Sequence, residues 1–153
     1  MSIRPATVAD TSAILDIGAA AYRNTDYVQI ADACPDAAAD LISTMRETGV
    51  LMVEDRAGEI VGIVGMIIAP YFLNRAYRTA HQLIWWVEPS MRGRGIGRTL
   101  LSASELACRY IGVAAINNIT HANSPAAATA LYADMGYPNT ETSFSKVTRY
   151  GHH

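Results

Sequence analysis

Six consecutive residues, Arg92 to Gly97, carry the most distinctive chemistry in the sequence. They read RGRGIG, with three glycines and two arginines, and they follow the apolar run HQLIWWV at 81–87. Glycine lets a ligand come close to the backbone, and the N–H groups at the start of a helix attract anions. Because the preceding run predicts a buried strand and the following residues predict a helix, the loop predicts a phosphate-binding site. A plain flexible turn is the alternative.

Two well-known phosphate-binding loops do not match this pattern. A Walker loop ends in Gly-Lys followed by Ser or Thr, whereas Gly97 is followed by Arg98. A dinucleotide fingerprint has the spacing GxGxxG beside the first strand and an acidic residue about 20 residues later. Here the spacing is GxGxG, past the middle of the chain. The loop therefore argues against an NTPase and against a dinucleotide-binding protein.

The composition describes a well-filled globular domain without a strongly charged surface. Of the 153 residues, 50% are hydrophobic and 17% are charged, and the formal net charge is −2. Binding to a nucleic acid depends on neutralising its phosphates, so we expect no nucleic-acid partner. No apolar stretch reaches the roughly 20 residues that span a bilayer, and no signal-peptide pattern is present, so we expect a cytoplasmic protein without a membrane partner.

The two cysteines, Cys34 and Cys108, have no CxxC or Cys/His spacing. Such isolated cysteines are typical of reduced thiols in a cytoplasmic protein. We therefore expect neither a disulfide nor a metal site.

The elements around the loop are expected to form one mixed sheet flanked by helices. Period and turn residues predict helices at 11–23, 35–47, 97–112 and 125–135, and strands at 2–7, 50–55, 59–69, 81–87, 113–122 and 140–150. Residues 71–79 are expected to form a loop. The pattern predicts an α/β fold in a single domain over residues 1–150. We interpret residues 151–153, which read GHH, as the remnant of an affinity tag.

Several segments of the chain resemble the GNAT superfamily of N-acetyltransferases. Arg92-x-x-Gly95-x-Gly97 matches that family's R/Q-x-x-G-x-G/A motif, and WWVEPSMRGRGIGRTLL resembles its fourth strand, pyrophosphate loop and following helix. ANSPAAATALYADMGY resembles its later N…A…LY…GF segment, and ETSFSK is similar to the end of many members. The resemblance covers nearly the whole chain and is greatest to small stand-alone members from bacteria and phages. It implies the GNAT-like acyl-CoA N-acyltransferase fold.

The resemblance implies acetyl-CoA as cosubstrate. Its pyrophosphate is expected on the backbone N–H groups of the glycine loop, and its pantetheine arm along the strand at 81–87, where a backbone N–H could also hold the oxyanion. The implied binding residues are Trp86, Val87, Arg92, Gly93, Arg94, Gly95, Ile96, Gly97 and Asn123. Asn123 matches the family's asparagine, and shaping the turn before Ser124 is an equal alternative for it.

The resemblance also implies a catalytic acid but leaves the base open. Tyr132, in LYADMGY, matches the tyrosine that protonates the CoA sulfur in similar enzymes, whereas a buried core aromatic is the alternative. Some members carry a glutamate on the preceding strand, but Asn117 and Asn118 stand there. The remaining candidates for the base are Glu88, Gln82 beside His81, His121 and a water relay. We take Glu88 as the base to test.

The resemblance therefore implies an N-acetyltransferase that moves an acetyl group from acetyl-CoA to a primary amine by direct attack in a ternary complex. We expect a small-molecule or peptide amine as acceptor. The acidic segment 22–36 could attract a cationic amine, and the aromatic and basic side chains of 71–78 could line its pocket or contact a second copy in a homodimer. The alternative is a non-catalytic acyl-CoA-binding regulatory module, which Asn117 and Asn118 favour and Tyr132 disfavours.

Overall fold

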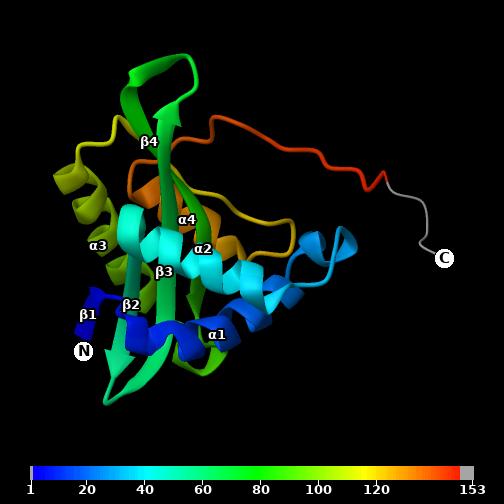
Figure 1. The fold of residues 1–153 in the computed structure, drawn as a ribbon, viewed down its shortest axis with the longest axis vertical. Helices are drawn as coiled ribbons and strands as arrows, with labels where there is room; N and C mark the ends of the chain where they lie inside the picture. The colour runs from blue at the N-terminus through cyan, green and yellow to red at the C-terminus, as the bar shows by residue number, and fades with distance from the viewer. Residues whose placement is uncertain (1, 149–153) are drawn as a thin grey trace.

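Helices cover both faces of a five-stranded mixed sheet in the computed structural model, which describes residues 2–148 (Figure 1). The strands are β1 (Ser2–Pro5), β2 (Val50–Arg56), β3 (Glu59–Tyr71), β4 (Asn74–Val87) and β5 (Ala115–Asn117), in that spatial order. The helices are α1 (Thr11–Arg23), α2 (Pro35–Thr48), α3 (Ile96–Ile111) and α4 (Ala126–Asp134), with the 3-10 turns η1 (Val8–Asp10), η2 (Asp26–Gln29) and η3 (Pro89–Met91). Neighbouring strands are antiparallel except β4 and β5, which are parallel. The predicted fold class is confirmed.

The sheet separates two apolar layers. α1 and α2 cover one face, where Ile14, Ile17 and Met45 pack with the side chains of β2 and β3. α3 covers the other face, and Tyr132 of α4 joins the same layer. Consecutive strand residues point to opposite faces, so the adjacent Trp85 and Trp86 pack in different layers.

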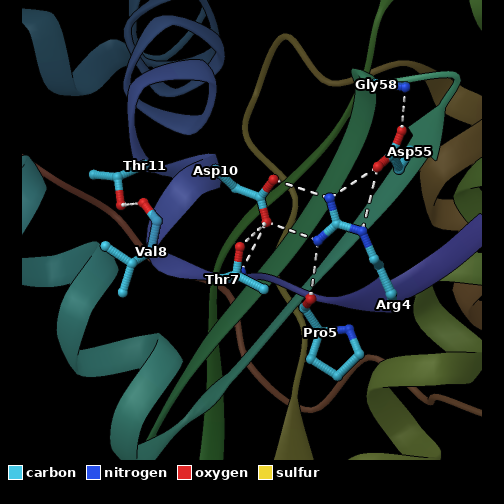
Figure 2. Close-up of polar contacts among 8 residues, drawn as sticks. All are labelled: Arg4, Pro5, Thr7, Val8, Asp10, Thr11, Asp55 and Gly58. Atoms are coloured by element: carbon cyan, nitrogen blue, oxygen red, sulfur yellow. Dashed lines mark hydrogen bonds and ion pairs between the residues drawn. The ribbon is translucent and has the colours of Figure 1, made fainter.

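An ion-pair cluster fastens β1 to the start of α1 and to β2 (Figure 2). Arg4 donates to Asp10 at 2.7 and 3.0 Å and to Asp55 at 2.9 and 3.3 Å. Asp10 also accepts from the Thr7 N–H at 2.7 Å, and Asp55 accepts from the Gly58 N–H at 2.8 Å in the turn of the β2–β3 hairpin. The hydrogen bonds from Arg4 lower the pKa of Asp10 to about 2. The cluster therefore joins three elements through two carboxylates.

β4 begins earlier than the sequence predicts. The expected loop at 71–79 is wrong, because β3 extends to Tyr71 and β4 starts at Asn74. β2 pairs with β3 only as far as Met66, and β5 pairs with β4 only over residues 79–81, so the far ends of β3 and β4 continue as a two-stranded ribbon with Phe72 and Leu73 exposed at its turn (Figure 1). Pairing satisfies the backbone groups of both strands, although the apolar pattern that marks a buried strand is missing.

A bulge in β4 separates it from β5. Gly65 of β3 pairs with Ile84 and Met66 pairs with Gln82, so Leu83 has no partner across the ladder. Residues 79–81 of β4 pair with both β3 and β5, whereas Gln82 and, beyond the bulge, residues 84–87 pair only with β3 within the described chain. A bulge bends its strand, so β5 ends after three residues instead of running over 113–122 as expected.

The expected final strand is wrong over the residues that the structure describes. Residues 138–148 form neither helix nor strand and extend away from the body (Figure 1). Phe144 is 92% exposed there, and Lys146 is also exposed. Alternating residues form a strand only where a sheet edge pairs with them, and this segment reaches none. Residues 149–150 of the expected strand and the interpreted tag remnant at 151–153 lie outside the described residues.

Candidate active site

The glycine loop leads into α3 and leaves open space above its backbone. Gly93 and Gly95 adopt left-handed φ angles of 78° and 80°, which favour glycine. A Cβ built at either position would have no atom within 4 Å. Within the described chain no side chain caps α3, whose first residue is Ile96, so the N–H groups of its first turn are free to bind a ligand. Such free N–H donors suit an anion such as a diphosphate.

The arginines of the loop region differ in their contacts. The Arg92 guanidinium stacks on Trp86, 4.6 Å from Cζ to the ring centroid, and its Nε donates to the Val87 carbonyl at 2.9 Å. Arg98 forms an ion pair with Asp134 of α4. Arg94 is exposed. The structure thus brings Trp86, Val87 and Arg92 together where the loop meets the end of β4.

Trp85 connects the loop to α4. Its indole Nε1 donates to the Gly97 carbonyl in the first turn of α3 at 3.2 Å, and a Cβ on Gly97 would lie 3.1 Å from its ring. On its other side, the Trp85 ring is 5.3 Å from that of Tyr132. A continuous row of contacts therefore runs from the glycine loop through Trp85 to Tyr132. It lies beside the part of β4 that pairs with β3 but not with β5.

Tyr132 lies in a buried, polar corner. It is 8% exposed, and its hydroxyl lies 2.8 Å from the Ile119 carbonyl and 3.1 Å from Gln82 Oε1. Burial raises the pKa of Tyr132 to about 12. The phenol is therefore protonated at neutral pH, as a group that donates a proton must be. Its hydrogen bond to Gln82 links α4 to β4 just before the bulge.

The titratable candidates for the base lie on three different segments. Glu88 follows β4 directly, its N–H donates to the Val61 carbonyl at 2.9 Å, and its half-buried carboxylate has no hydrogen bond within residues 2–148. His81 Nε2 lies 2.8 Å from Thr79 Oγ1 on β4. His121 lies after β5, and burial lowers its pKa, an effect that Asp26 opposes.

Two segments far apart in the sequence meet beside this site. The His121 ring packs edge-on against Tyr27 of η2, with centroids 4.9 Å apart, and the Asn123 side chain donates to the Asn24 carbonyl. Asn123 therefore contacts the end of α1, and none of its hydrogen bonds in the described chain reaches the glycine loop. The sequence carries no signal for these contacts, because they join residues about a hundred positions apart.

A surface hollow of about 450 Å³ lies away from this site. Glu105, Leu106 and Arg109 of α3 line it together with Ser102 and Met135. The ion pair between Glu105 and Arg109, at 2.7 Å, lies along it. None of the site residues expected from the sequence lines this hollow, so we assign it no part in the site.

A comparison with known families now decides the identity of this arrangement. The acetyltransferase (GNAT) domain matches residues 46–138, more than half of the 153 residues. The chain belongs to the GNAT acetyltransferase family. The matched region includes the glycine loop, Trp85 and Tyr132. This GNAT protein is accordingly an acetyltransferase that depends on acetyl-CoA.

Solved structures share the fold of this GNAT chain at low sequence identity. An acetyltransferase from Trypanosoma brucei is 21% identical, with a TM-score of 0.71 over 96% of this chain and 99% of that one. An aminoglycoside N-acetyltransferase in complex with CoA is 15% identical, with a TM-score of 0.74 over 97% and 95%. A Clostridium acetobutylicum protein described as a predicted acetyltransferase, solved with acetyl-CoA, is 14% identical, with a TM-score of 0.72 over 95% and 94%. A comparison with curated proteins finds no match.

Two negative findings apply to the part of the GNAT chain that the structure describes. No helix within residues 2–148 is long and apolar enough to cross a membrane. In the same residues, no three His, Cys, Asp or Glu side chains gather in a way that could hold a metal ion.

Proposed function

We propose that this GNAT enzyme transfers the acetyl group of acetyl-CoA to a primary amine by direct attack within a ternary complex. The observation that carries the proposal is the row of contacts from the glycine loop through Trp85 to Tyr132. It lies beside the part of β4 that pairs on one side only in the described chain. A cosubstrate with its diphosphate on the loop would then extend toward the phenol.

In this proposal the chain binds its cosubstrate mainly through backbone groups. Bound acetyl-CoA supplies a carbonyl activated by its thioester and a thiolate leaving group. The diphosphate lies on the N–H groups of residues 92–97, with Arg94 at the rim. Trp86 and Val87 offer the backbone of β4 to the pantetheine arm, as an added strand would pair. On the acceptor side, the Asn123 side chain donates to the Asn24 carbonyl and so joins the loop after β5 to the end of α1.

The transfer step uses two side chains of the enzyme. The amine nitrogen forms a bond to the acetyl carbon, and the carbonyl electron pair moves onto oxygen. That pair then returns as the carbon–sulfur bond breaks and the electron pair of this bond moves to sulfur. Tyr132 gives its proton to that sulfur, and the proton that the amine loses passes through water to Glu88. Solvent then returns a proton to Tyr132 and removes one from Glu88, so the enzyme is unchanged.

The acceptor in this proposal is a small-molecule or peptide amine, and we place its pocket where η2 meets the loop after β5. Tyr27, His121 and Asp26 come together there. A carboxylate beside aromatic rings suits a cationic group. The same proposal takes residues 1–150 as one cytoplasmic domain that acts without a nucleic-acid or membrane partner, with homodimer formation open to measurement.

Two assays on the full chain test the proposal together. Saturating CoA should raise the melting temperature by roughly 5–10 °C at about 100 times its Kd, because it binds only the folded state. Thiol release from acetyl-CoA should then exceed the blank with at least one class in a panel of aminoglycosides, polyamines, amino acids and peptides.

The results separate the candidate functions. An unchanged melting temperature at saturating CoA would contradict the cosubstrate site. A clear rise in melting temperature with CoA, but no thiol release from any amine, would favour the non-catalytic acyl-CoA-binding module. Asn117 and Asn118 are the residues that favour this alternative.

A further inference from the structure

The side-chain amide of Gln82 is buried with only half of its hydrogen-bonding capacity used. The residue is 3% exposed, and its Oε1 accepts from the Tyr132 hydroxyl at 3.1 Å and from the Ile119 N–H at 3.3 Å. Its Nε2 is buried and has no hydrogen-bond partner within residues 2–148. An unsatisfied buried donor costs about 1–3 kcal/mol, so folded proteins rarely keep one without a use.

The neighbours of this amide determine which way it faces. The Ile119 N–H can only donate to it, and the Tyr132 hydroxyl, whose single hydrogen also has the Ile119 carbonyl at 2.8 Å, lies 3.1 Å from the amide oxygen. Exchanging the oxygen and nitrogen of the amide would set the NH₂ group against the Ile119 N–H, donor against donor. The oxygen is therefore directed to Tyr132 and Ile119, and the two N–H bonds are left for another acceptor.

The position of Gln82 in the sheet indicates which acceptor that is. The residue comes directly after His81, the last residue of β4 that pairs with β5, and directly before Leu83 of the bulge. Its side chain meets Tyr132 in the apolar layer that also contains Trp85. The free donors thus lie beside the proposed acid, where the two strands part.

We propose that Gln82 Nε2 donates a hydrogen bond to the carbonyl oxygen of the acetyl thioester. The inference rests on the proposed function and adds a residue to it. When the amine bonds to the acetyl carbon, the carbonyl electron pair moves onto this oxygen, and it returns as the carbon–sulfur bond breaks. A fixed donor in a site shielded from water stabilises that charge more than it stabilises the neutral carbonyl.

The Ile119 peptide explains how the pair stays in place before the thioester enters. Its N–H and its carbonyl contact Gln82 and Tyr132, respectively. The bond to Gln82, at 3.3 Å, is long for an N–H donor. In this proposal the acetyl group enters where β4 and β5 part and brings its carbonyl oxygen to Nε2, while Oε1 keeps its contacts.

The test compares Gln82→Met with the wild type in the full chain. Methionine has a similar length and shape but cannot donate. The control is Asn139→Met, which removes an exposed amide outside the site. For each protein we would measure Kd for acetyl-CoA and for CoA, kcat with an amine that gives thiol release in the panel proposed above, and the infrared stretch of bound acetyl-CoA labelled with ¹³C at the thioester carbonyl.

The proposal makes specific demands on these measurements. In Gln82→Met the carbonyl stretch should move to higher frequency, because the hydrogen bond that weakens the C=O bond is lost. Kd for acetyl-CoA should rise about five- to tenfold while Kd for CoA stays the same, and kcat should fall about 10²- to 10³-fold. Asn139→Met should match the wild type in every measurement.

The infrared band and the ratio of the two Kd values decide the proposal, because a merely structural role would not change them. A wild-type band and Kd ratio in Gln82→Met would overturn it, even if kcat fell.

If Gln82→Met does not fold, Gln82→Glu serves instead, since its carboxylate still accepts from Tyr132 and Ile119. At a pH where this carboxyl is ionised, the same loss is expected, and unaltered values would again refute the role. Failure of the wild type to bind CoA would instead contradict the proposed function itself.

Discussion

Tyr132 combines a deeply packed ring with a hydroxyl that faces polar partners. The ring lies 5.3 Å from Trp85, and the hydroxyl reaches Ile119 and Gln82. Phenylalanine would keep the packing and remove only the proton donor. We expect Tyr132→Phe to lower kcat about 10²-fold at pH 7 and to leave Kd for CoA within about twofold of the wild type. Steady-state kinetics and CoA titration measure both quantities, and a variant with normal turnover would mean that water or another group protonates the thiolate.

Glu88 is tested by a change that keeps its shape and removes its charge. If its carboxylate accepts the proton of the amine, Glu88→Gln should lower kcat/KM about 10²-fold at pH 7, with CoA affinity unchanged. His121→Gln, measured in parallel, covers the half-buried imidazole beside Tyr27. An undiminished rate in Glu88→Gln together with a reduced rate in His121→Gln would move the base to the loop after β5.

At the residue scale, the sequence could predict single site residues but not which of their side chains contact one another. Tyr132 and the loop glycines stand in short motifs whose local spacing carries the information. The contact between Gln82 and Tyr132 joins residues 50 positions apart and depends on the bulge at Leu83. No periodic pattern marks a single extra residue in a strand, so the sequence placed Gln82, beside His81, among the candidates for the base and not as a donor to the thioester.

At the scale of elements, the junction between the loop and α3 gives the clearest prediction. Gly95 has a φ of 80° in open space, so a β-branched residue there is strained by its backbone and not by crowding. We expect Gly95→Val to raise Kd for CoA at least about 10²-fold while α3 still folds. Isothermal titration and circular dichroism measure the two effects.

A matched glycine provides the control for that variant. Gly18 lies in α1, and a Cβ there would also have no atom within 4 Å, but its φ is not left-handed. Gly18→Val should therefore retain wild-type CoA affinity. Wild-type affinity in Gly95→Val as well would remove the glycine loop from the site.

The limits of the helices agree with the sequence prediction better than the limits of the strands do. α1 occupies residues 11–23 as predicted, because its apolar period and polar start are local signals. β4 is longer than predicted, and β5 is shorter, since strand limits depend on which partner edge is available. The tail at 138–148 shows the same dependence, because its alternating residues find no edge to pair with.

At the scale of the whole molecule, the Arg4 cluster links acidity to stability. The pKa of Asp10 falls from 3.8 to about 2 on folding, mainly through its hydrogen bonds with Arg4. A carboxyl with a lowered pKa stabilises the fold above its unfolded value, and this contribution disappears as the pH falls toward the folded value. We expect the free energy of unfolding to decline between about pH 4 and pH 2.

Urea unfolding at several pH values checks this expectation. Asp10→Asn should lower the free energy of unfolding by about 2 kcal/mol at pH 7 and give a flatter pH profile than the wild type. Asp16→Asn, on the exposed side of α1, is the control and should keep the wild-type profile. Parallel profiles for Asp10→Asn and the wild type would show that the acid sensitivity arises elsewhere.

The extended tail also gives the protein a chemical handle. Lys146, the only lysine in the sequence, stands on the tail, outside the packed layers and far along the chain from the glycine loop. Reagents that react with primary amines should modify this one side chain, in addition to the terminal amine of the chain. A dye, a biotin or a solid support coupled to side-chain amines should therefore attach at Lys146, on the exposed tail outside the packed layers.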